Sequence, residues 1–159
     1  MWHRRMMQGR PDDSRIHRRL IDSLYVEAML LADEARAYFD EGGRSDREAL
    51  DPLARVAFSC ESLKVTTRLM HVIAWLLTQR AVAAGELPPR DALHPSRRLG
   101  AAPVSDGDAV SGMPAAAGQL VTASADLYRR VARLDAAQSE AASPASPARR
   151  MLDRLNAAF

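Results

Sequence analysis

Residues 51–84 read DPLARVAFSCESLKVTTRLMHVIAWLLTQRAVAA, which is the residue pattern of one long helix. Apolar and small side chains recur there at alternating steps of three and four residues, the spacing of a single helical seam. This first seam consists of Leu53, Val56, Cys60, Leu63, Thr67, Met70, Ala74, Leu77, Ala81 and Ala84. A surface helix needs only one such apolar side.

A second apolar seam lies on the opposite side of the same helix and consists of Phe58, Val65, Leu69, Val72 and Leu76. Because both sides are apolar, we expect the helix to be covered on both sides. The cover is either another segment of the chain or a second copy of it. The sequence therefore favours a helical protein that associates.

Two further segments have helical patterns. Apolar side chains recur at helical spacing over residues 14–41, after good N-caps at Asp13 and Ser14 and before Gly42, and again over residues 114–140. We predict an all-α, antiparallel three-helix bundle over residues 14–142, with helices at about 14–41, 51–84 and 114–140. The surplus seam on the middle helix predicts a homodimer of two such bundles.

The segments outside these helices have a different texture. Residues 85–113 are rich in glycine and proline, which predicts a mobile loop. Residues 143–159 predict a disordered tail with a short amphipathic, basic peptide from Arg149 to Phe159. Such a peptide either orders on a partner or docks on its own bundle.

Length, charge and cysteine content limit the classes of protein. The 159 residues suit one domain, and the formal net charge is only +2. The first 20 residues carry six arginines against two aspartates, so we expect residues 1–13 to form a flexible basic arm. The single cysteine, Cys60, excludes an internal disulfide and is expected to be buried and reduced. Without a signal peptide or membrane-spanning run, we expect a cytoplasmic protein that binds no membrane.

Residue combinations that perform chemistry are missing from the sequence. The four histidines stand apart from other metal-ligating residues, and Cys60 is about 16 Å from His71 along their helix. The sequence also lacks a phosphate-binding loop and a nucleophile elbow. We therefore predict a protein that is not an enzyme, with no catalytic residues, metal or cofactor.

One polar stripe on the middle helix has two interpretations. It consists of Glu61, Lys64, Arg68, His71, Trp75 and Thr78. The stripe is either a solvated face on which Glu61 pairs with Lys64, or a recognition face in which Arg68, His71 and Trp75 contact a partner. In a third arrangement Trp75 turns inward and packs against the loop.

Two blocks of this helix resemble a known family. Residues 61–70 read ESLKVTTRLM and residues 75–82 read WLLTQRAV, and with them the chain resembles the bacterial RcdA-like family, named for a regulator of degradation of the cell-cycle factor CtrA. The likeness extends over residues 14–87 and returns at residues 127–135, LYRRVARLD. It covers about half the chain.

The resemblance implies a homodimer of three-helix bundles with a disordered C-terminal tail. It also implies a non-enzymatic adaptor that delivers cargo proteins to the protease ClpXP, through ClpX and a priming response regulator like CpdR, in cell-cycle-regulated proteolysis. We expect the partner-binding residues to be Arg149, Arg150, Met151, Leu152, Leu155 and Phe159 in the tail, followed by Arg68, His71 and Trp75.

The alternative is a dimeric DNA-associated regulator that uses the arginine-rich N-terminal arm. An arm of this kind binds phosphates weakly and in a salt-sensitive way. The long helices and the proline-rich connection fit a helix-turn-helix domain poorly. The sequence therefore disfavours nucleic acid as a partner.

Overall fold

The computed structural model describes residues 11–142 and 147–158, and all regular structure in these residues is helical. Three long helices dominate: α2 (Pro11–Ala37), α4 (Pro52–Ala83) and α7 (Ala115–Ala142). The shorter elements are a π-helix (Tyr38–Gly42), α3 (Arg44–Glu48), α5 (Pro89–Ala92), a 3-10 turn (Pro95–Arg97), α6 (Gly107–Ser111) and α8 (Pro147–Ala158). Within the described residues, none of the helices is both long enough and apolar enough to cross a membrane.

Helix α4 begins and ends where its sequence signals lie. The side chain of Asp51 accepts a hydrogen bond of 2.8 Å from the backbone nitrogen of Ala54, and proline follows this cap at the first helical position. At the other end Gly85 has φ +77°, a conformation that side-chain-bearing residues rarely adopt. The backbone nitrogens of Gly85 and Glu86 then bond the carbonyls of Val82 and Ala81 at 3.1 and 2.9 Å. This Schellman motif ends the helix at the predicted place.

The second seam of α4 forms the centre of the core. Its side chains are at most 3% exposed, which confirms that this side of the helix is covered within one chain. The covering residues come from α2 (Ile21, Leu24, Ala28, Ala35) and from α7 (Ala117, Leu120, Val121, Leu127, Val131). The first seam lies on the outer side of α4, with Met70 turned toward a groove beside α2.

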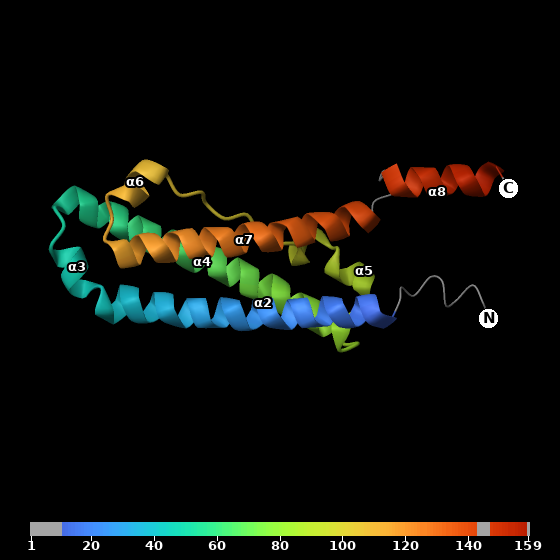
Figure 1. Cartoon of the computed structure of the whole chain (residues 1–159), viewed down its shortest axis with the longest axis horizontal. Helices are drawn as coiled ribbons and strands as arrows, with labels where there is room; N and C mark the ends of the chain where they lie inside the picture. The colour runs from blue at the N-terminus through green and yellow to red at the C-terminus, as the bar shows by residue number, and fades with distance from the viewer. Residues whose placement is uncertain (1–10, 143–146, 159) are drawn as a thin grey trace.

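Helix α4 runs antiparallel to α2 but parallel to α7 (Figure 1). Arg18 and Asp22 on α2 contact Ala83 and Arg80 on α4, in the opposite order along the two helices. Arg68 and Trp75 on α4 bond Ser124 and Asp135 on α7 in the same order along both helices. The expected all-antiparallel arrangement is therefore wrong for α4 and α7. The reason is the long connection, residues 84–114, which runs back along the bundle before α7 starts (Figure 1).

An aromatic cluster closes the turn between α2 and α4. The rings of Tyr38, Phe39 and Phe58 have centroids 5.2–6.2 Å apart. Tyr38 donates a hydrogen bond of 2.8 Å to Asp46, and burial, followed by this bond, raises the pKa of Tyr38 to about 12. The first long helix thus ends in a π-helical turn rather than running regularly to residue 41.

The structure differs in part from the basic arm and the disordered tail predicted for the two ends of the chain. The expected basic arm spans residues 1–13, but residues 1–10 lie outside the described residues and α2 already begins at Pro11. Residues 143–146 of the expected tail also lie outside them. Where we expected a disordered tail, residues 147–158 form α8, which extends beyond the end of α7 (Figure 1).

Candidate partner-binding surfaces

The first seam of α4 is exposed. Five large apolar side chains follow each other along it, with exposed fractions of 81, 60, 68, 63 and 47% for Leu53, Val56, Leu63, Met70 and Leu77. Cys60 is exposed between them, so the expected buried thiol is a wrong prediction. Its position on the outer side of α4, opposite Val65 and Val72, explains the difference. The described residues of the chain provide no cover for this side of the helix.

The geometry of the first seam is that of a helix-pairing surface. From Leu53 to Leu77 it extends about 36 Å along α4 at the helical rise per residue. Scattered apolar residues are normal on a protein surface, but a continuous row at heptad spacing marks an association site. The surface is therefore suited to another helix of comparable length.

A groove between α2 and α4 lies beside the first seam. It has a volume of about 370 Å³, and its apolar lining includes Phe39, Leu69, Met70 and Ile73. Because Met70 belongs to both the groove and the first seam, the two form one apolar area. A partner helix on the first seam therefore has a recess beside it.

The polar stripe of α4 is buried, not exposed. Glu61, Arg68 and Trp75 are each 2% exposed, and His71 is half-buried. The expectation that Arg68, His71 and Trp75 form an exposed recognition face is thus wrong. Physically, the connection between α5 and α7 covers this face of α4. The connection and α7 together bond Arg68 and Trp75, whereas Nδ1 of His71 is buried without a hydrogen-bond partner.

Arg68 holds the connection onto the bundle. Its guanidinium donates to the carbonyl of Pro103 at 3.1 Å and to the hydroxyl of Ser124 on α7 at 3.2 Å. It also donates to the hydroxyl of Ser105, which in turn donates to the carboxylate of Glu61. Burial lowers the pKa of Arg68, and the Glu61 charge raises it in partial compensation. In place of the expected mobile loop, this segment is bound by a buried ionic network.

A second anchor lies about two helical turns further along α4. The indole nitrogen of Trp75 donates to Asp135 on α7 at 3.0 Å, so Trp75 has turned inward. The same carboxylate accepts hydrogen bonds of 2.9 and 3.2 Å from Arg98, and this bonding raises the pKa of Arg98. Asp135 therefore links α4, α7 and the connection.

At Gly100 the connection passes close to α4. A Cβ added there would lie 2.5 Å from Nδ1 of His71, and the Gly100 carbonyl accepts a hydrogen bond of 2.7 Å from Tyr128. We expect Gly100→Ala to lower the free energy of unfolding by about 1–3 kcal/mol, the usual cost of overpacking. Urea denaturation of the purified protein measures this change.

The matched test for this clash uses His71. In a His71→Ala background the imidazole is gone, so adding Gly100→Ala should cost almost nothing more. An equal cost of Gly100→Ala with and without His71 would show that the close approach does not limit this position.

The predicted tail residues lie together on α8. Met151, Leu152 and Leu155 are 66, 59 and 50% exposed, and Arg150 is exposed as well. The side chain of Arg149 and the whole of Phe159 lie outside the described residues. The apolar side of α8 is therefore a second exposed apolar surface, and the predicted partner-binding residues that are exposed in the described part of the chain all lie on this helix.

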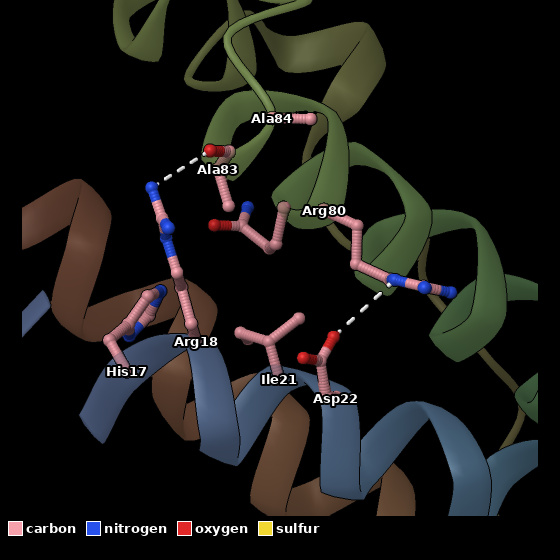
Figure 2. A pocket seen from close by; sticks show the side chains of 8 residues that line it. His17, Arg18, Ile21, Asp22, Arg80, Ala83 and Ala84 are labelled. Carbon is pink, nitrogen blue, oxygen red and sulfur yellow. Dashed lines mark hydrogen bonds and ion pairs between the residues drawn. The ribbon is translucent and has the colours of Figure 1, made fainter. Parts of the chain in front are cut away.

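A small cavity of about 200 Å³ lies between the start of α2 and the end of α4 (Figure 2). Arg18 donates to the carbonyl of Ala83 at 3.0 Å across it, and Arg80 pairs with Asp22 at 3.5 Å. The amide nitrogen of Gln79, which lines the cavity, is buried without a hydrogen-bond partner. These contacts join the end of α4 to α2. Elsewhere too, the described residues contain no group of three side chains that could hold a metal ion.

Sequence reasoning missed the partners of the polar stripe. Ser105 and Ser124 are single hydroxyls in unrelated segments, and Asp135 lies 60 residues from Trp75. The one available signal was the composition of the stripe. A tryptophan and an arginine on one helix face between two apolar seams need either a partner or burial.

The fold and its surfaces define an all-helical protein with two exposed apolar helix faces. The chain belongs to the RcdA-like family. The matching family model, described as "Protein of unknown function (DUF1465)", covers residues 13–159. The crystal structure of RcdA from Caulobacter crescentus CB15 is 36% identical in sequence, with a TM-score of 0.62, and the match covers 75% of this chain and 90% of that chain. No curated protein matches the chain.

Proposed function

We propose that this protein is a non-enzymatic adaptor in regulated proteolysis, which delivers cargo proteins to a ClpXP protease primed by a CpdR-like response regulator in the cytoplasm. The observation that carries the proposal is the 36% identity to RcdA over 90% of that chain. An adaptor needs only binding surfaces, because the protease supplies ATP hydrolysis and peptide cleavage. The exposed apolar faces of α4 and α8 are surfaces of that kind.

We further propose that the first seam of α4 pairs two copies of the chain. A second copy offers the same regular row of apolar side chains, so a two-fold axis across α4 buries both rows against each other. The seam contains no charged residue between Leu53 and Leu77, which suits the dry centre of an interface. The dimer then carries two copies of α8.

The adaptor would act by proximity. Binding a cargo and the protease to one dimer replaces a bimolecular encounter with an intramolecular one, for which short flexible links give effective concentrations of about a millimolar. In this arrangement α8 contacts one partner, while the bundle supplies the dimer and the scaffold. Arg150, Met151, Leu152 and Leu155 are the residues we assign to that contact, together with Arg149 and Phe159.

The tail assignment is tested by a single charge on the apolar side of α8. Immobilised Leu155→Asp protein is expected to retain purified ClpX with the CpdR-like regulator at least about fivefold less well than the unchanged protein, because an aspartate disrupts an apolar contact. Deletion of residues 149–159 should have the same effect. Quantified pull-down of both partners measures the loss.

Asn156→Asp is the matched control, since it adds the same charge to the next position of the same exposed helix. It should leave the retained amount unchanged. Equal retention by the unchanged, Leu155→Asp and truncated proteins would remove α8 from the partner-binding surface. If, in addition, the full-length protein failed to accelerate degradation of any cargo by the primed protease, the adaptor role itself would fall.

A further inference from the structure

Helix α8 is short, basic and apolar on one side. Its 12 residues carry three arginines against one aspartate, and Met151, Leu152 and Leu155 line the exposed apolar side. An isolated helix of this length is marginal in water, so its helical form needs a surface to pack against. The charge of that surface should be negative.

A groove of that character lies between α2 and α7. It has a volume of about 410 Å³, with an apolar floor of Leu30, Leu31 and Ala123. Its rim carries three carboxylates, Glu27, Glu34 and Asp126. Glu27 pairs with Arg130 and Asp126 pairs with Arg129, so Glu34 is the rim carboxylate left to attract a further cation. Leu30 is 64% exposed on this face, so the floor has no cover in the bundle.

The chain is long enough for α8 to reach this groove. Ala142 at the end of α7 lies about 18 Å beyond Arg130 and about 24 Å beyond Asp126 at the helical rise. The five Cα steps from Ala142 to Pro147 span at most about 17 Å, and α8 itself is about 18 Å long. A chain that reverses after Ala142 therefore lays α8 antiparallel to α7 along the groove.

We propose that α8 docks on its own chain in the groove between α2 and α7, with Met151, Leu152 and Leu155 against Leu30 and Leu31, and with Arg150 and Arg154 along the carboxylate rim that contains Glu34. Arg150 and Arg154 are one turn apart along one side of α8, opposite an acidic row on α2. The docked helix hides the apolar side that a partner would bind. In the structure α8 extends beyond the end of α7 with this side exposed (Figure 1). The docked arrangement is then a second, closed state of the chain that competes with partners.

This docking is independent of dimerisation and of the adaptor role. None of the residues that line the groove belongs to α4, so the first seam stays free when α8 is docked. The test below contains no partner protein. Its failure would leave the proposed function untouched, and failure of the proposed function would leave the docking in place.

Disulfide trapping of the full-length protein tests the docking. In a Cys60→Ser background, Leu30→Cys and Leu155→Cys together should form a disulfide within one chain under mild oxidation. The matched control keeps the native Cys60, which is exposed on the opposite side of the bundle, and adds Leu155→Cys alone. We expect the first pair to cross-link at least about tenfold faster, because the tether and the groove together raise the effective concentration.

Non-reducing gels separate the outcomes by mass. A cross-link at the mass of one chain supports the proposal, whereas a cross-link at the mass of two chains assigns α8 to a second copy and overturns it. Equal rates for the two pairs overturn it as well. Circular dichroism before oxidation verifies that each variant keeps its helices.

A charge exchange provides the second measurement. Added to the trapping pair, Glu34→Arg should slow intrachain cross-linking at least about fivefold, and Arg154→Glu on top of it should restore the rate. An unchanged rate in Glu34→Arg, or no restoration in the double exchange, would show that the acidic rim does not recognise α8.

Discussion

Leu63→Asp is expected to convert the proposed dimer into monomers without unfolding the bundle. Leu63 is 68% exposed near the middle of the first seam, so within one chain the aspartate stays in water and costs little. In the dimer, two aspartates would be buried near the two-fold axis, which costs several kcal/mol for each unpaired charge. The dimer dissociation constant should therefore rise at least about 100-fold.

Sedimentation equilibrium of the purified protein measures this shift. Val104→Asp is the control, because Val104 is an equally apolar side chain, 88% exposed, on the connection rather than on the seam. It should leave the dissociation constant unchanged. If the unchanged protein sediments as a monomer at high concentration, or if Leu63→Asp stays dimeric, the first seam does not pair two copies.

Arg68→Leu is expected to destabilise the fold by several kcal/mol, because Pro103, Ser105 and Ser124 lose a charged donor and the buried Glu61 carboxylate loses a nearby positive charge. The Glu61 carboxylate stays buried, and its remaining partners are Ser105 and Lys64, the latter at 3.0 Å. The connection also loses its bonds at Pro103 and Ser105. The free energy of unfolding measured in urea should fall, and the protection of residues 98–105 against hydrogen exchange should fall as well.

Arg129→Leu is the comparison for this change. Its ion pair with Asp126 is exposed on α7, so its loss should cost less than about 1 kcal/mol. Combining Glu61→Leu with Arg68→Leu should restore part of the lost stability, because the Glu61 carboxylate is then no longer buried without the positive charge of Arg68. Equal costs for Arg68→Leu and Arg129→Leu would contradict the structural role of the network.

The helices of this protein could be predicted from the sequence because their signals are local. Asp51 and Pro52 cap α4, Gly85 ends it, and the second seam at Phe58, Val65 and Val72 is the core. The relative direction of α4 and α7 could not be predicted in this way. It depends on where a long connection runs, and this path is set by contacts between residues distant in sequence, such as Arg68 with Pro103.

The candidate surfaces were predictable only where helical periodicity alone decides exposure. The first seam and the apolar side of α8 follow from spacing, since one helix face was already assigned to the core. The environment of the polar stripe could not be predicted, because a helix face of mixed polar and apolar residues has the same sequence pattern whether water or a polar segment covers it. Three hydrogen-bond partners from the connection and α7 decide that Arg68 is structural.

The two described ends of the chain lie at one pole of the molecule, and the α3 turn lies at the other (Figure 1). Two bundles joined along α4 in the same direction would therefore present both copies of α8 side by side, suited to two sites on one partner. Joined in opposite directions, they would separate the two copies of α8 by about the 48 Å length of the 32-residue α4. The polarity of the pairing thus sets the valency that a partner encounters.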